Sequence, residues 1–133
     1  MNSCIISCPK HIEPHRLPGG LFWHDEQDDI WCGVSAKVKR TRSLMTDTYK
    51  ELRSITGRKV RLLWDATEAR PMDKDIRDLI YDEMKKTFTA IAVVSGSPMG
   101  LMIAAALCAS TGCPVPLKFF HKEDDARRWL KKF

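Results

Sequence analysis

The strongest constraint on the fold is a segment without a single charged side chain, which extends over residues 87–117. A membrane span needs about 20 consecutive apolar residues, but the polar sequence Ser95-Gly96-Ser97-Pro98 divides this segment into two shorter apolar parts. Ser is a favoured helix N-cap and Pro a favoured first helical residue. The segment therefore predicts a buried strand followed by a buried helix, and no membrane span.

The rest of the chain alternates between short β-prone segments and segments with helical spacing. Residues 21–24 and 30–34 flank the acidic stretch 25–29, and this arrangement predicts an antiparallel hairpin. The last stripe, residues 126, 129, 130 and 133, has the spacing i, i+3, i+4 and i+7 of an amphipathic helix. The further expected strands are 60–64, 90–94 and 115–120. The further expected helices are 41–56, one that begins at Pro71 or Asp73, and 98–109. Gly57 lies just past the helix 41–56, and Gly112 lies just past the helix 98–109.

This order of elements predicts an α/β fold. Strands separated by helices imply right-handed crossovers and a mainly parallel sheet of about five strands, of which the first two are antiparallel, with about four helices. The length of 133 residues is typical of one domain. We expect this domain to occupy residues 20–133. Residues 1–19 contain three prolines and no sustained period, which predicts an irregular or partly disordered leader.

The element order and a short motif carry a family resemblance. The run from Asp65 to Asp75 contains Asp65-Ala66-Thr67 after a strand and Met72-Asp73 before a helix. It resembles the STAS domain of anti-sigma-factor antagonists, a fold that is also similar to SEC14-type lipid carriers. In antagonists, Asp-x-Ser follows the strand and Met-Asp-Ser-Ser-Gly opens the helix. Asp65, Met72 and Asp73 match this pattern, whereas Lys74 stands at the phosphorylated serine.

The departure at Lys74 has a consequence for regulation. The resemblance implies an interaction module that cannot be switched by phosphate at this position. Thr67 and Ser97 are the hydroxyls that we place near the same face, and modification of either one would restore a switch. Ser97-Pro98 and the segment 120–130 also resemble small bacterial STAS-like proteins of unassigned activity.

Two loops at the carboxyl ends of expected strands hold the candidate site, because ligands and partners of open α/β sheets meet these loops. The candidate partner- or ligand-binding residues are Asp65, Thr67, Arg70, Asp73, Lys74, Ser95 and Ser97. Residues 95–97 present hydroxyls and backbone N–H groups at a helix start, which suits an anion. Simple helix capping by serine explains the same residues.

Metal binding and redox chemistry have weaker signals. A zinc site could be formed by Cys4, Cys8, His11 and His15, judged by their spacing. Pro9 and Pro14 interrupt any regular turn between these residues, and an irregular leader explains the same residues without a metal. The cysteine count of five is odd and the N-terminus lacks a secretory pattern. We therefore expect reduced thiols, a cytoplasmic protein and no cofactor.

The charges are distributed unevenly along the chain. Residues 37–61 contain nine Lys or Arg and two acids, whereas residues 65–83 contain seven acids and three Lys or Arg. No aromatic platform accompanies the basic segment, so we expect no nucleic-acid partner. A protein partner or a second copy of the chain is the expected use of these charges.

Catalytic motifs are absent from the sequence, which contains no nucleophile elbow, phosphate-binding loop, dinucleotide fingerprint or zinc-protease motif. The leading hypothesis is a non-enzymatic regulatory or protein-interaction module that uses the loop 65–74 and the helix after it. The alternative is a SEC14-like carrier that holds an apolar or phosphorylated molecule between the sheet and the helix 99–109. We also expect Trp64 and Trp129 to be mostly buried.

Overall fold

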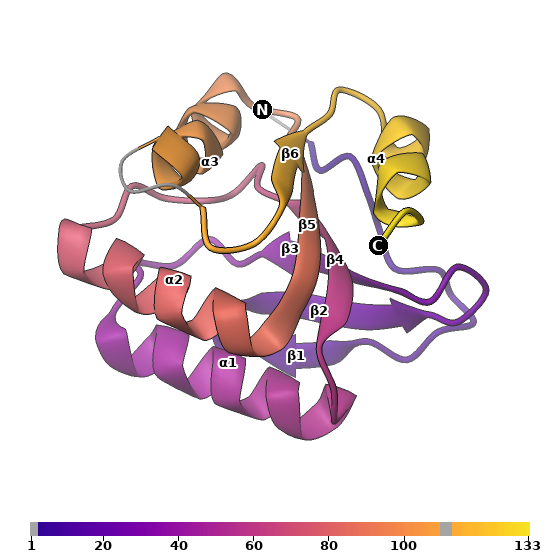
Figure 1. Cartoon of the computed structure of the whole chain (residues 1–133), viewed down its shortest axis with the longest axis horizontal. Helices are drawn as coiled ribbons and strands as arrows, with labels where there is room; N and C mark the ends of the chain where they lie inside the picture. The colour runs from indigo at the N-terminus through magenta and orange to yellow at the C-terminus, as the bar shows by residue number, and fades with distance from the viewer. Residues whose placement is uncertain (1–2, 110–112) are drawn as a thin grey trace.

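The computed structural model describes residues 3–109 and 113–133, and these residues form one mixed sheet with helices on both faces (Figure 1). The described strands are β1 (His15–Leu17), β2 (Gly20–Asp25), β3 (Ile30–Ser35), β4 (Val60–Asp65), β5 (Phe88–Val94) and β6 (Leu117–Phe119). The described helices are α1 (Arg42–Thr56), α2 (Lys74–Thr87), α3 (Pro98–Ala109) and α4 (Glu123–Leu130).

The strands lie side by side in chain order. The pairs β1–β2 and β2–β3 are antiparallel, and the pairs β3–β4, β4–β5 and β5–β6 are parallel. Because each new parallel strand is added in the same direction through a right-handed crossover, the connecting helices are expected on one face. Figure 1 shows this arrangement: α1, α2 and α3 lie on one side of the sheet and α4 on the other. The predicted α/β class and the antiparallel start are confirmed.

Two apolar cores follow from the alternation of side chains along the strands. On β4, Leu62 packs in the core under α1 and α2, and its neighbour Leu63 packs in the core under α4. The same division separates Phe22 from Trp23 on β2. Leu63 has no exposed surface. The sheet is therefore buried on both faces, as is typical of parallel sheets.

Local signals account for the helix boundaries. The Thr41 hydroxyl caps α1 by accepting a hydrogen bond from the Leu44 N–H, and Gly57 ends this helix with φ +68°, a conformation that glycine adopts without strain. Of the two start residues that the sequence offered for α2, Pro71 and Asp73, it is Asp73 that forms the N-cap, although its side chain makes no capping bond. The expected Gly112 lies outside the described residues.

The leader differs from the expectation. Residues 15–17 form β1, a sixth strand, which pairs with β2. Ile6 is only 4% exposed and joins the core that α4 covers. The prolines prevent a longer regular element here, but Ile6 and Leu17 are apolar and become buried in the two cores. The leader is thus irregular over most of its described length and is nevertheless packed against the sheet.

Both tryptophans singled out from the sequence keep some exposed surface but pack against a core, Trp64 against the core under α1 and α2 and Trp129 against the core under α4. Trp64 donates from Nε1 to the Ser35 Oγ at 2.6 Å. Trp129 contacts the rings of Phe120 and Phe133, with centroid separations of 5.7 and 4.8 Å. Ala126 and Leu130 are the α4 residues that reach the sheet core, so Trp129 lies at the edge of the contact. The expectation that Trp64 and Trp129 are mostly buried is thus confirmed, although neither side chain is fully enclosed.

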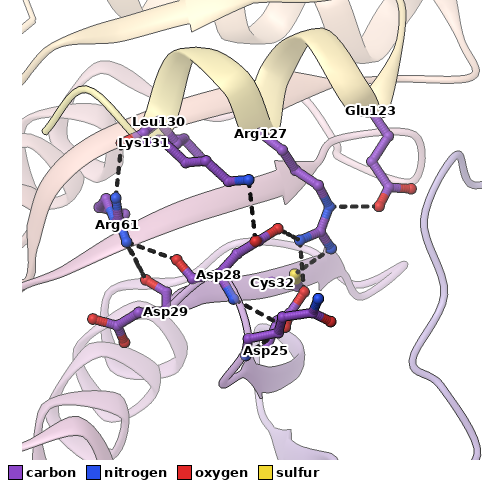
Figure 2. A network of polar contacts seen from close by, with 10 residues as sticks. Asp25, Asp28, Asp29, Cys32, Arg61, Glu123, Arg127, Leu130 and Lys131 are labelled. Carbon is purple, nitrogen blue, oxygen red and sulfur yellow. Dashed lines mark hydrogen bonds and ion pairs between the residues drawn. The ribbon is translucent and has the colours of Figure 1, made fainter.

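A polar network joins α4 to the hairpin loop between β2 and β3 (Figure 2). Arg127 contacts Asp25 at 2.6 Å, Asp28 at 3.1 Å and Glu123 at 2.8 Å. Arg61 donates to the backbone oxygens of Asp28 at 2.7 Å and Leu130 at 3.3 Å. The network therefore connects segments from both ends of the chain.

Candidate functional site

Asp65 lies at the carboxyl end of β4 and has no exposed surface. Its Oδ2 accepts hydrogen bonds from the N–H groups of Ile5 at 2.5 Å and Ile6 at 3.1 Å. Its Oδ1 accepts from the Thr67 N–H at 2.9 Å and from the Thr67 hydroxyl at 2.5 Å. Four donors thus satisfy the carboxylate inside the protein, and two of them come from the leader.

Thr67 and Ser97 extend this arrangement to the start of α3. The Thr67 Oγ1 accepts from the Gly96 N–H at 2.7 Å. The Ser97 Oγ donates to the Thr67 carbonyl at 3.1 Å and accepts from the Gly100 N–H at 3.0 Å, which is the bond of a helix cap. The Ser95 Oγ accepts from the Ser97 N–H at 3.0 Å. The structure therefore brings Asp65, Thr67, Ser95 and Ser97 together and engages their side-chain oxygens with one another and with nearby backbone.

Two glycines allow the backbones at this edge to approach closely. A Cβ atom at Gly96 would lie 2.0 Å from the Ser3 carbonyl oxygen, and one at Gly100 would lie 2.2 Å from the Ala66 carbonyl oxygen. Any larger residue would force these segments apart. The leader, the loop after β4 and the start of α3 therefore form one packed unit over the carboxyl ends of the central strands.

Cys4 lies beside this unit but lacks the character of a nucleophile. Burial and the neighbouring carboxylates of Asp65 and Glu68 raise the pKa of its thiol. Cys32, under α4, has its pKa raised by burial to about 12. Because the thiolate is the reactive form, both groups remain protonated thiols at neutral pH.

The remaining predicted residues face outward. Asp73 and Lys74 are exposed at the start of α2, where the Lys74 Nζ contacts the Asp78 carboxylate at 2.9 Å one turn later. Arg70 is half-buried and lines a hollow of about 280 Å³. The residues around this hollow are Lys37, Thr67, Glu68, Ala69, Arg70, Ser97 and Met99. The predicted residues thus form two groups. We call Asp65, Thr67, Ser95 and Ser97 the buried polar unit, and Arg70, Asp73 and Lys74 the exposed rim.

A neighbouring apolar groove was missed by the sequence reasoning. We call it the α3 groove; it has a volume of about 300 Å³ and is lined by Pro71, Met72, Arg77, Met99, Met102, Ile103 and Ala106. Figure 1 shows α3 near the start of α2, and the lining residues come from α3, from the loop before α2 and from the first turn of α2. Met99 is 52% exposed and Met102 is 71% exposed. The signal for this groove was the composition of α3, which has no polar face to turn toward solvent.

The leader histidines lie away from the buried polar unit. His11 and His15 line a hollow of about 570 Å³ together with His24 and Trp31, and His24 stacks on Trp31 at a centroid distance of 5.1 Å. The Cys8 thiol instead contacts the Ile12 carbonyl at 3.4 Å. Within residues 3–109 and 113–133, no group of three or more His, Cys, Asp or Glu side chains is arranged to hold a metal ion.

The core beneath α1 and α2 contains a small cavity that bears on a carrier function. This cavity has a volume of about 60 Å³, with Phe22, Leu52 and Ile91 among its lining residues. It has room for a few water molecules. Over the same described ranges, no helix has the length and apolar character required to cross a bilayer.

Comparisons with known proteins bear on the fold. The chain is similar to an uncharacterised protein of the DUF3478 family from Shewanella loihica PV-4, whose crystal structure has a SpoIIAA-like fold. The TM-score is 0.52 at 17% identity, and the match covers 90% of this chain and 91% of the other. This likeness confirms the STAS-like fold and says nothing about activity.

The search of curated proteins gave no match. A family of domains described only as of unknown function, DUF7793, matches residues 35–133, which is most of the chain. The protein therefore belongs to the DUF7793 family and has a SpoIIAA-like α/β fold.

Proposed function

We propose that the protein is a non-enzymatic cytoplasmic regulatory module that binds a protein partner through the α3 groove and the exposed rim beside it. One observation carries this proposal: α3 is apolar on all sides, yet Met99 and Met102 are exposed. A helix that is hydrophobic all round belongs in a buried environment. Exposed apolar patches of this kind mark interaction surfaces.

The chemistry of the neighbouring residues supports binding rather than catalysis. The Asp65 carboxylate has no exposed surface and is satisfied by four donors, so it is not free to act as a general base. The hydroxyls of Thr67 and Ser97 are buried and hydrogen-bonded as well. The groove itself is lined by methionines and other apolar side chains with a single arginine.

Partner binding by this module is constitutive in our proposal. Lys74 has no hydroxyl to phosphorylate, and its ammonium group is paired with Asp78. Thr67 and Ser97 are 6% and 4% exposed, so a kinase would have to open the packed unit to reach them. Phosphopeptide mapping of the protein from its host should find neither residue modified; stoichiometric phosphate on Thr67 or Ser97 would contradict a constitutive module.

The test of the proposed function uses a photo-crosslinking amino acid at position 102 in the host cell. Position 46, exposed on α1, is the matched control. We expect one identified protein to be crosslinked from position 102 and not from position 46. With that protein purified, Met102→Glu should weaken binding by about tenfold or more, as for a central contact residue, and Thr46→Glu by less than about twofold. Equal crosslinking from both positions would refute the proposal.

The carrier remains the alternative, because an apolar groove of about 300 Å³ is also large enough for a small ligand. Native mass spectrometry of the protein from its own host separates the two. A bare chain mass, or its multiples, is expected for the interaction module. A stoichiometric additional mass that is lost in Met102→Glu would favour the carrier.

A further inference from the structure

The α3 groove has a regular apolar stripe. Met99, Met102, Ile103 and Ala106 follow one another at i, i+3, i+4 and i+7, and all four line the groove. Gly100 and Ala104, on the opposite side of α3, are buried against the rest of the protein. Met99, Met102 and Ala106 are exposed, whereas Ile103 is half-buried and also packs against the core under α1 and α2. The exposed part of the stripe has the periodicity of one helix face that another helix could cover.

Methionine makes this surface adaptable. Met72 from the loop before α2 adds a third thioether side chain to Met99 and Met102 on the groove wall. Unbranched methionine side chains repack around different partners, and they are common on surfaces that accept amphipathic helices. An acyl chain would instead need a pocket that encloses most of its surface. With Met102 71% exposed, the groove is open and suits the side of a helix better than a lipid tail.

Arg77 supplies an independent observation about charge. Its Nε atom is buried and has no hydrogen-bond partner among the described residues. Arg77 also forms no ion pair within residues 3–109 and 113–133, although it lines the α3 groove. A buried guanidinium nitrogen without an acceptor is costly, and a carboxylate is the group that satisfies it best. Because Arg77 lines the groove and has no ion pair among the described residues, its guanidinium group is available to a carboxylate of a partner.

The adjoining hollow has the same sign of charge. It shares Met99 with the α3 groove and contains Lys37 and Arg70 against one acid, Glu68. Neither Lys37 nor Arg70 is ion-paired in the part of the chain that the structure describes. Asp73 and Asp75 lie exposed at the nearby start of α2, and Lys74 is already paired with Asp78. Asp73 and Asp75 line neither hollow, and among the residues that do line the groove and the adjoining hollow Lys37, Arg70 and Arg77 outnumber the single acid Glu68, so the lining is positively charged.

We propose that the α3 groove binds an acidic amphipathic helix of a partner protein, whose apolar side chains contact Met99 and Met102 while its carboxylates pair with Arg77 and Arg70. This inference rests on the proposed function and adds the chemistry of the partner. It makes electrostatic complementarity, in addition to apolar burial, a requirement for binding.

The experiment selects displayed random peptides of about 16 residues, long enough to form a helix on their own, on the purified full-length chain. We expect the enriched peptides to carry net negative charge and apolar residues at i, i+3 or i+4. Their affinity should fall by about tenfold or more with Arg77→Met, which keeps the aliphatic stem, and with Arg70→Met. Lys85→Met, on the same helix but outside the groove, is the matched control and should change affinity by less than about twofold. Circular dichroism and thermal unfolding establish that each variant is folded.

Each other outcome contradicts a defined part of the argument. Enriched peptides that are neutral or basic, or that bind Arg77→Met and Arg70→Met as tightly as the native chain, overturn the acidic partner. If binding of enriched peptides is insensitive to Met102→Glu, the proposed function fails as well. Met102-dependent binding to vesicles of equal parts phosphatidylcholine and phosphatidylglycerol, with no peptide enriched, assigns the groove to a membrane surface. A dimer in sedimentation velocity that Met102→Glu dissociates assigns it to a second copy of the chain.

Discussion

At the scale of single residues, Asp65 and Asp73 both match the family motif, yet they occupy opposite environments. Asp65→Ala would leave the buried N–H groups of Ile6 and Thr67 without an acceptor. We expect it to lower the free energy of unfolding by about 3 kcal/mol, since each buried unsatisfied group costs about 1–3 kcal/mol. Asp73→Ala, at an exposed cap without a side-chain bond, should cost less than about 0.5 kcal/mol. Urea unfolding measures both, and equal losses would contradict the buried position of Asp65.

At the scale of elements, the docked leader can be tested with two adjacent isoleucines. Ile6 is 4% exposed within a core, and Ile5 beside it is 40% exposed. Ile6→Ala should lower the free energy of unfolding by about 2–4 kcal/mol, the range for a large-to-small change in a core. Ile5→Ala keeps the same backbone donor to Asp65 and should cost less than about 1 kcal/mol. A small loss for both variants in urea unfolding would show that the leader is not packed against the sheet.

At the scale of the whole molecule, the network between the hairpin loop and α4 predicts acid sensitivity. Burial raises the pKa of Asp28, but hydrogen bonds and charges from Lys131 and Arg127 outweigh it and lower the pKa below 3.8. A hydrogen bond from His24 lowers the pKa of Asp29. The folded state thus holds these protons more weakly than the unfolded state. The resulting stability is present above about pH 4 and is lost as the pH falls through the folded-state pKa values.

Arg127→Met tests this prediction because it removes one partner of Asp28. We expect the decrease in stability below about pH 4 to become shallower in this variant. Arg128→Met is the matched control, since Arg128 is exposed and pairs with Asp125 on its own helix. Urea unfolding at a series of pH values measures the slopes. The assignment would be wrong if Arg127→Met and Arg128→Met had the same dependence on pH.

The sequence by itself determined what depends on neighbours along the chain. Thr41, Gly57 and Asp73 mark helix ends because capping and left-handed conformations are local, and the run 87–117 predicted β5 and α3 because burial on both sides excludes charge. Together these signals gave the α/β order and the STAS-like fold. They also located the two loops that contain Asp65, Thr67 and Ser97.

The tertiary structure decided what depends on segments distant in the sequence. The buried Asp65 carboxylate depends on hydrogen bonds from the backbone N–H groups of residues 5 and 6, which are 59 or more positions away in the sequence. The leader has no hydrophobic periodicity from which this contact could be predicted. The exposure of Met99 and Met102 could not be predicted, because periodicity shows that a helix is apolar but not which neighbours cover it. Arg77 likewise acquired its place in the α3 groove only when the fold brought the start of α2 near α3. Local sequence sets the elements, whereas the free energy of packing sets which of their surfaces remain uncovered.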